Sequence, residues 1–179
     1  MNAVDGEASG PMAEFVALRE EILHWSQHIH GIFVFQVGAS GAVLSFALSQ
    51  PGREPVALAV PIVSYLLCTR YYYALLTAVN IGMYIRTVLS PKVSGGLGWE
   101  EWNRSIQVDL RPRLYATLVL TFPGTAFVAF VVGTIGLAFG DLALSLRLGF
   151  SALWCAALVF LLLNIRLVVQ MRNYRAKLP

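Results

Sequence analysis

The sequence predicts an all-α integral membrane protein with four transmembrane helices arranged as two hairpins. Of its 179 residues, 57% are hydrophobic and only 13% are charged, whereas about 25% are charged in an average soluble domain. Four apolar segments each approach the roughly 20 residues that a helix needs to cross the hydrocarbon layer. We also expect an N-terminal amphipathic helix and a long cytoplasmic extension of the second span.

Two different segments precede the first apolar stretch. Residues 1–12 are expected to be a disordered N-terminus, and they lack the short apolar core of a cleavable signal peptide. Residues 13–30 are expected to form a cytoplasmic amphipathic helix, because apolar side chains recur there at 3-4-3-4 spacing. These are Phe15, Leu18, Ile22, Trp25 and Ile29. Such a seam favours pairing with a second helix.

The first transmembrane hairpin, with its cytoplasmic extension, is expected over residues 31–90. The first span is about residues 31–49, and a short turn separates it from a second span that begins at Pro55. The 15 residues from Pro55 to Thr69 reach only about 22 Å as a helix. Arg70 is therefore expected near the cytoplasmic membrane surface, where long basic side chains extend towards water.

An aromatic cluster follows Arg70, and we interpret it as the membrane boundary. Tyr71 and Tyr72 are predicted interfacial anchors, because tyrosine is enriched at the headgroup level. The alternative that Arg70 lines a pore or pairs across subunits stays open. Beyond this boundary the helix is expected to continue to residue 90, since no proline occurs before Pro91.

In this extension polar side chains share one face of the helix. They are Arg70, Tyr73, Thr77, Asn80 and Tyr84. If subunits surround a pore, these residues are the candidates to line its cytoplasmic mouth. Other polar groups that could face a pathway include Gln36, Ser40 and Ser64, and Gln36 needs a hydrogen-bond partner in lipid.

The cytoplasmic loop of residues 91–113 is expected to contain a short interfacial helix. Trp99 and Trp102 are three residues apart and would share one face, so both are predicted interfacial anchors. The segment GGLG in this loop lacks the lysine and the serine or threonine of a phosphate-binding loop. It therefore gives little support to nucleotide binding.

Residues 114–166 are expected to form the second transmembrane hairpin, and residues 167–179 a basic cytoplasmic tail. Small residues recur along the third and first spans and are predicted to pack helices closely; they are Thr117, Thr121, Thr125, Gly133, Gly38 and Gly41. Packing inside one bundle and packing between subunits both remain open. Pro123 is expected to distort the third span.

Basic residues orient the chain in the membrane. Eleven lysines and arginines lie before the first span, between Arg70 and Arg113, or from Arg166 onward, and only Arg53 and Arg147 lie in the other two turns. Because basic residues prefer the cytoplasmic side, both termini are expected to be cytoplasmic. The predicted location is a bacterial inner membrane.

The sequence contains no arrangement typical of catalysis. Glu20, His24 and His28 share one side of a helix, a spacing that can bind metal or sense protons, but a polar flank at the membrane surface is the simpler interpretation. We therefore expect no enzyme activity, no metal and no cofactor. The expected partners are the lipid bilayer, further copies of the chain and a soluble cytoplasmic protein, with no nucleic acid.

Short motifs resemble elements of small uncharacterised bacterial multispan membrane proteins: LREEI at 18–22, NIGMYIR at 80–86 and GLGWEEWN at 96–103. The arrangement of N-terminal helix, tight hairpin and cytoplasmic extension is similar to SLATT-type membrane effectors, although the second hairpin departs from their two-span plan. This resemblance implies a pore-forming or membrane-perturbing role in bacterial stress or anti-phage defence. We expect a homo-oligomeric channel or effector gated by its cytoplasmic helices, or alternatively a non-conducting scaffold or sensor that recruits a soluble partner.

Overall fold

The computed structural model describes residues 3–93, 98, 115–140 and 143–177, with side chains described between residues 10 and 173 of these ranges. Every regular element in this part of the chain is helical, and four helices are long and apolar enough to cross a membrane. The expected all-α fold with four apolar helices is therefore confirmed for the described residues.

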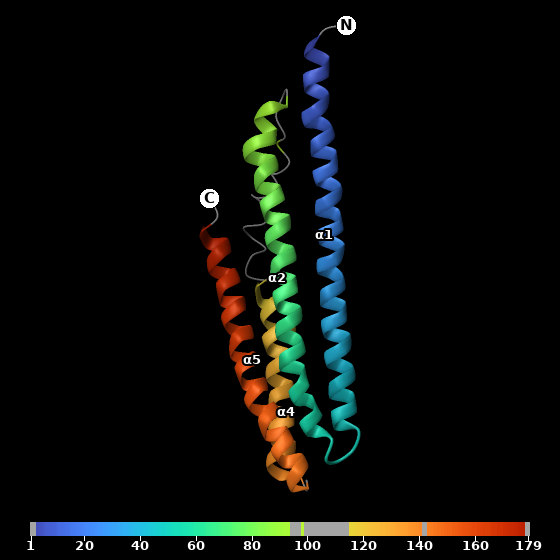
Figure 1. The fold of residues 1–179 in the computed structure, drawn as a ribbon, viewed down its shortest axis with the longest axis vertical. Helices are drawn as coiled ribbons and strands as arrows, with labels where there is room; N and C mark the ends of the chain where they lie inside the picture. The colour runs from blue at the N-terminus through green and yellow to red at the C-terminus, as the bar shows by residue number, and fades with distance from the viewer. Residues whose placement is uncertain (1–2, 94–97, 99–114, 141–142, 178–179) are drawn as a thin grey trace. The chain divides into compact units, whose positions relative to one another are not determined.

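The described residues form four α-helices and four shorter helical turns (Figure 1). In chain order the elements are α1 (Ala3–Leu48), the 3₁₀ turn η1 (Glu54–Ala59), α2 (Val60–Tyr84), the π turn η2 (Ile85–Leu89), the 3₁₀ turn η3 (Ser90–Lys92), the π turn η4 (Leu120–Gly124), α4 (Thr125–Phe139) and α5 (Leu144–Lys177). Residues 115–119, before η4, are also helical.

Two helices are longer than the sequence suggested. Helix α1 includes residues 3–12, where we expected disorder, and it joins the expected cytoplasmic helix to the first span without a break. A single glycine, Gly31, lies at the expected junction, and one glycine inside a helix costs only about 1 kcal/mol. Helix α5 likewise continues to Lys177, through most of the expected tail.

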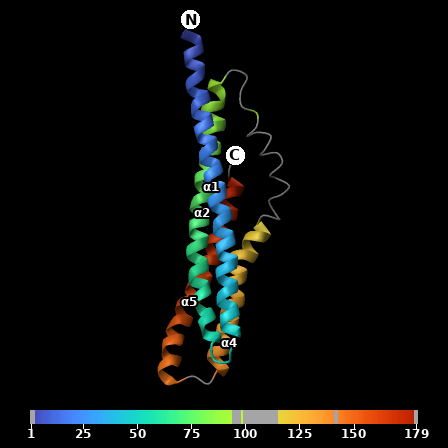
Figure 2. The same cartoon turned by 90° about the vertical axis from the view of Figure 1, so that its right-hand side faces the viewer.

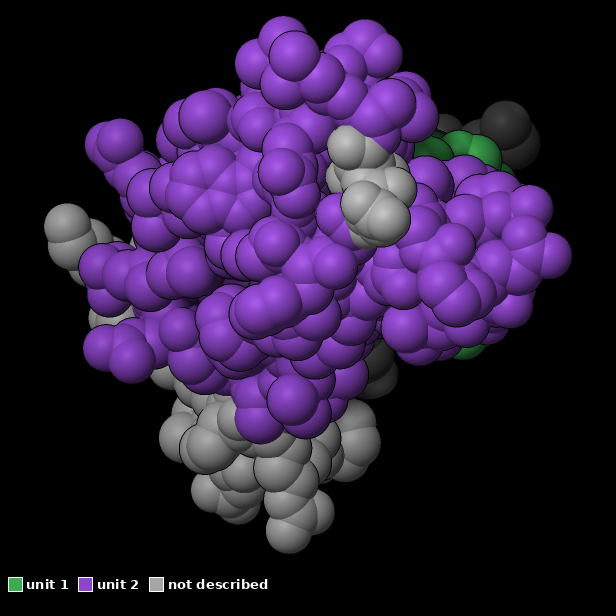
Figure 3. All heavy atoms as spheres, turned by 90° about the horizontal axis from the view of Figure 1, so that it is seen from below, with its two compact units in different colours: residues 1–31, 72–112 green, residues 32–71, 113–179 purple. Residues whose placement is uncertain are grey.

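The chain divides into two compact units, coloured separately in Figure 3. Unit 1 comprises residues 1–31 and 72–112, and unit 2 comprises residues 32–71 and 113–179. Within α1 the division falls after Gly31, the residue where the first span was expected to start. Within α2 it falls between Tyr71 and Tyr72, which we interpreted as the membrane boundary.

In unit 1, α1 and the end of α2 are antiparallel neighbours. Trp25 meets Tyr73 edge to face, with 6.0 Å between ring centroids. The Tyr84 hydroxyl donates a hydrogen bond of 2.8 Å to the Glu14 carboxylate. The five apolar residues of the 3-4-3-4 seam in α1 are all half-buried, so the sequence seam coincides with a packed stripe.

Trp25→Ala should loosen this pairing of α1 with α2. An aromatic pair contributes about 0.5–1.5 kcal/mol beyond its buried area, so trypsin cleavage after Arg19 should become about fivefold faster. Leu23→Ala is the matched control, because Leu23 lies on the same helix but is 61% exposed. Equal cleavage rates for the two variants would show that Trp25 does not hold unit 1 together.

In unit 2, α4 packs closely on η1 and the start of α2. A buried cluster forms where these elements and α1 meet; it contains Ala47, Ala57, Val60 and Ala129. Gly133 and Gly136 on α4 are buried against Leu58 and against Glu54 and Pro55 of η1. Small residues thus bring the α4 backbone close to the first hairpin.

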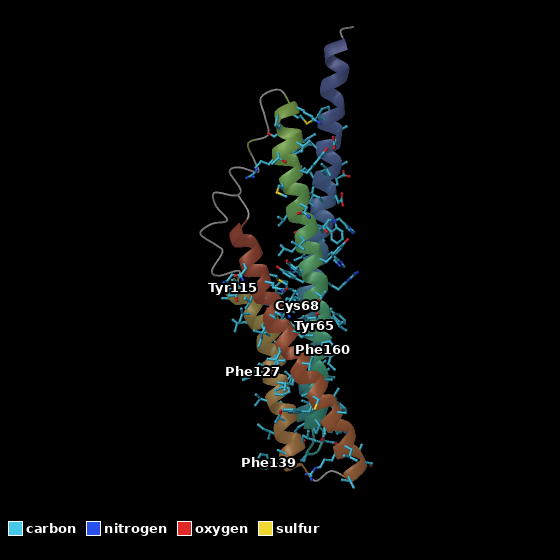
Figure 4. All side chains as sticks on the ribbon, turned by 60° about the vertical axis from the view of Figure 1, so that its left-hand side comes forward. Tyr65, Cys68, Tyr115, Phe127, Phe139 and Phe160 are labelled. Carbon is cyan, nitrogen blue, oxygen red and sulfur yellow. The ribbon has the colours of Figure 1, made fainter. Side chains whose placement is uncertain are left out.

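Helix α5 completes unit 2 and runs in the opposite direction to α4 (Figures 1 and 2). The indole of Trp154 donates a 2.9 Å hydrogen bond to Thr134 on α4 and lies 5.4 Å from the Phe130 ring. On the α2 side, Phe160 packs on Tyr65 with 5.4 Å between ring centroids (Figure 4). Helix α5 is therefore held by contacts to two helices.

The outer surface of unit 2 carries many large apolar side chains. Phe127 is 57% exposed and Phe139 86% exposed (Figure 4). Others are Val34, Phe35, Val37, Leu120, Val128, Ile135, Leu148, Val159 and Leu162. A water-soluble protein seldom exposes so large an apolar surface. Together with the four long apolar helices, this surface indicates a membrane protein.

Candidate functional site

Polar side chains gather in the interior of unit 2, around Pro123. Three of them are fully buried: Gln36 from α1, Ser64 from α2 and Asn164 from α5. Each lies in a predominantly apolar stretch of its helix, and all three belong to hydrogen-bonded groups that reach the π turn η4. We call this set, with Ser40 and Thr125, the η4 network.

The network exists because Pro123 changes the backbone hydrogen bonds of the third span. Proline has no N–H to donate, and the chain passes through a π turn over Leu120–Gly124. The N–H of Thr125 donates to the carbonyls of Leu120 and Phe122, whereas in a regular α-helix it would donate to that of Thr121. The distortion expected at Pro123 is thus a π turn that leaves carbonyl oxygens open to side chains.

The first half of the network is centred on Gln36. Its amide nitrogen lies 3.1 Å from the Ser40 hydroxyl, 3.1 Å from the Thr125 hydroxyl and 3.4 Å from the Thr121 carbonyl oxygen. The Thr125 hydroxyl donates to the same carbonyl at 2.6 Å. The sequence expectation that Gln36 needs a hydrogen-bond partner is therefore met inside unit 2.

The second half of the network links α5 to η4 through α2. Asn164 donates from its amide nitrogen to the Ser64 hydroxyl at 3.0 Å. Ser64 in turn donates to the Phe122 carbonyl at 2.9 Å. Because Thr121 and Phe122 are consecutive, the two halves meet adjacent carbonyl groups of one turn.

Two buried atoms of the network have no hydrogen-bond partner among the described residues. They are the amide oxygens of Gln36 and Asn164. An unpaired buried polar atom costs about 1–3 kcal/mol. The network therefore ties four helical segments together but leaves one acceptor unpaired at each of two amide groups.

The chemistry of the network is that of neutral groups. Hydroxyl and amide side chains join helices and bind water, but they are weak acids and bases near neutral pH. Within the described residues, no group of three or more histidine, cysteine, aspartate or glutamate side chains could hold a metal ion. The arrangement is suited to packing, hydration and conformational change.

The predicted polar stripe on α2 is not gathered into one site. Arg70 belongs to unit 2, whereas Tyr73, Thr77, Asn80 and Tyr84 belong to unit 1. Tyr73 and Tyr84 contact α1, as described above, and Thr77 donates to the Tyr73 carbonyl of its own helix at 3.1 Å. Arg70 and Asn80 are exposed.

The predicted interfacial anchors fall into three groups. Tyr71 is only 7% exposed, and its ring lies 5.1 Å from Phe33 and 5.6 Å from Phe122. It packs on protein within unit 2. Tyr72 is half-buried, and Trp99 and Trp102 lie outside the described residues.

Some of the predicted helix-packing residues are packed inside unit 2 and others are exposed. Thr121, Thr125 and Gly133 lie in the interior contacts of unit 2 described above, and Thr117 is exposed. Gly38 and Gly41 are exposed on α1, where an added Cβ atom would meet no neighbouring atom within 4 Å. Three of the four residues predicted for the third span thus pack within unit 2, and the two glycines predicted for the first span face outward.

Asn164 is the member of the network that we did not predict. Its signal is one asparagine in the apolar segment LLLNIR, and polar residues inside spans usually face the bundle interior.

Comparisons with protein-family models, curated proteins and solved structures find no match to this chain.

Proposed function

We propose that this protein is a homo-oligomeric channel or membrane-perturbing effector of the bacterial inner membrane, gated by its cytoplasmic helices. Both termini and residues 91–113 are cytoplasmic in this proposal, following the distribution of basic residues. The SLATT-type resemblance of the sequence favours the effector role.

The exposed small-residue face of α1 carries this proposal. Gly38, Gly41, Ala42 and Ser45 lie on one face of the helix, and all four are exposed. Such faces allow two membrane helices to approach closely. In unit 2 Gly133 and Gly136 of α4 are already covered by η1, whereas this face of α1 is open to a second copy of the chain.

The lengths of two helical segments support gating from outside the bilayer. The apolar helical segments Gly10–Leu48 and Glu54–Lys92 each contain 39 residues, which corresponds to about 58 Å. The hydrocarbon layer is only about 30 Å thick. Each segment therefore extends well beyond one crossing, and the excess can carry a signal to the spans.

Reconstitution in liposomes tests the proposal. The wild-type protein should release a trapped dye and should have an oligomeric mass in mild detergent. Gly41→Ile should block close helix approach, remove the oligomer and lower leakage at least about tenfold. Gly149→Ile is the control, because Gly149 is equally open but lies on α5. A wild-type protein that is monomeric and causes no leakage under any trigger would refute the proposal.

The alternative, a non-conducting scaffold or sensor, is favoured by a different observation. Met12, Val16 and Leu23 lie on one face of α1 in unit 1 and are 44%, 52% and 61% exposed. This apolar stripe suits a soluble partner helix. Changing all three residues to serine should abolish capture of a cytoplasmic partner if the alternative is right, and in that case the wild-type protein should release no dye from liposomes.

A further inference from the structure

The orientation of the two buried amide groups follows from their partners. The Thr121 carbonyl can only accept, so the end of Gln36 that faces it must be the NH₂ group. The Ser64 hydroxyl donates its proton to Phe122, so the end of Asn164 that faces Ser64 must also be NH₂. Rotating either amide would break these bonds, and both amide oxygens are therefore unpaired for a chemical reason.

Water is the ligand that suits these two oxygens. It donates two hydrogen bonds, carries no charge and bridges buried polar groups in many proteins. A cation would bring a full charge into a neutral interior, and charge without a counter-ion is costly there. Among the described residues of unit 2 the only acidic one is Glu54, in η1, and its carboxylate accepts from the Gly52 N–H.

The packing around the oxygens determines how water reaches them. Side chains close completely around both atoms, so the helices must separate locally before water can bind. The π turn offers a point of entry, because side-chain hydroxyls bind the Thr121 and Phe122 carbonyls and water can replace these hydrogen bonds. π turns inside α-helices also occur frequently at functional sites.

We propose that unit 2 has a second, more open packing in which water enters beside η4 and binds the amide oxygens of Gln36 and Asn164. This water site lies inside a single subunit and does not depend on the proposed oligomer. It gives each subunit a hydrated state and a dry state, and the unpaired amide oxygens lower the free-energy cost of the hydrated one.

A native cysteine reports on this opening. Cys68 is fully buried one helical turn after Ser64 on α2 (Figure 4), whereas Cys155 is exposed. A thiol reacts with N-ethylmaleimide as the thiolate, which does not form in a dry apolar core. In a Cys155→Ser background, the labelling rate of Cys68 in liposomes therefore measures how often water enters.

Cys68 should label slowly in this background, and Gln36→Leu with Asn164→Leu should slow labelling at least about tenfold. The matched control is Gln170→Leu with Asn173→Leu, since both residues are exposed on α5, and it should leave the rate unchanged. Replacing Na⁺ by choline should also have no effect. An unchanged labelling rate in the Gln36→Leu, Asn164→Leu variant would contradict the water site. A labelling rate that depends on Na⁺ would show that the ligand is a cation and would also contradict it.

A second measurement needs no variant and decides the matter if the leucine pair does not fold. Solid-state NMR can follow magnetisation from water protons to the side-chain amides of Gln36 and Asn164 in liposomes. Transfer should be much faster to these groups than to the backbone amide of Ala129, which is also fully buried. Transfer as slow as to Ala129 would overturn the proposal.

Discussion

Gly136→Ala is expected to destabilise unit 2 by about 3 kcal/mol, the upper part of the usual range for overpacking a core. The added Cβ atom would collide with Glu54 and with Pro55 Cδ, which would lie 2.9 Å away. Gly133→Ala should have a comparable effect, because its Cβ would lie 2.6 Å from Leu58 Cγ and 3.2 Å from the Leu58 backbone nitrogen. Helix α4 can avoid these collisions only by moving away from η1.

A glycine-to-alanine substitution should have the opposite effect on stability where the glycine is not packed against another element. An added Cβ at Gly149 meets no atom within 4 Å, so Gly149→Ala should stabilise its helix by up to about 1 kcal/mol. Unfolding in mixed micelles with increasing denaturing detergent, followed by circular dichroism, measures both effects. Equal stability of Gly136→Ala and Gly149→Ala would show that α4 does not pack on η1 as described.

Ser64→Ala should destabilise the protein by about 1–3 kcal/mol, the cost of leaving a buried polar group unpaired. The substitution removes the only described acceptor of the Asn164 amide and one of the donors to the Phe122 carbonyl. The Phe122 carbonyl still accepts from the backbone N–H of Thr125. Most of the cost should therefore come from Asn164.

A double-mutant cycle separates these contributions. Asn164→Leu alone should be nearly neutral, because it removes an amide that has one hydrogen bond and one unpaired oxygen. In that background Ser64→Ala should cost much less than in the wild-type protein. Additive effects of the two substitutions would mean that Asn164 and Ser64 are not coupled, and the described link between α5 and η4 would be wrong.

The sequence was sufficient to predict the four apolar helices, because hydropathy and length are properties of contiguous segments. The expected second hairpin, residues 114–166, contains α4, which ends at Phe139, and the first part of α5. The continuity of α1 could not be predicted, because the change from amphipathic to apolar pattern at residue 31 looks like a boundary. A helix can cross such a change when its backbone hydrogen bonds are unaffected by it.

The η4 network could be predicted only in part. The polarity of Gln36 and the proline at 123 were visible in the sequence, but their meeting depends on which carbonyls a π turn releases. Asn164 is 100 residues from its partner Ser64, and no spacing rule connects them. The ring contacts of Tyr71 with Phe33 and Phe122 could not be predicted either, because they depend on how separate helices pack.

The proposals for this protein require four membrane crossings with the N-terminal part of the chain in the cytoplasm. Labelling with a membrane-impermeant maleimide tests this most directly, using single cysteines at Ser26 and Gln50 in a background with Cys68→Ser and Cys155→Ser. In intact cells Gln50→Cys should label fully, and Ser26→Cys should label only after the membrane is permeabilised. Labelling of Ser26→Cys in intact cells, or protection of Gln50→Cys until permeabilisation, would contradict the proposed topology.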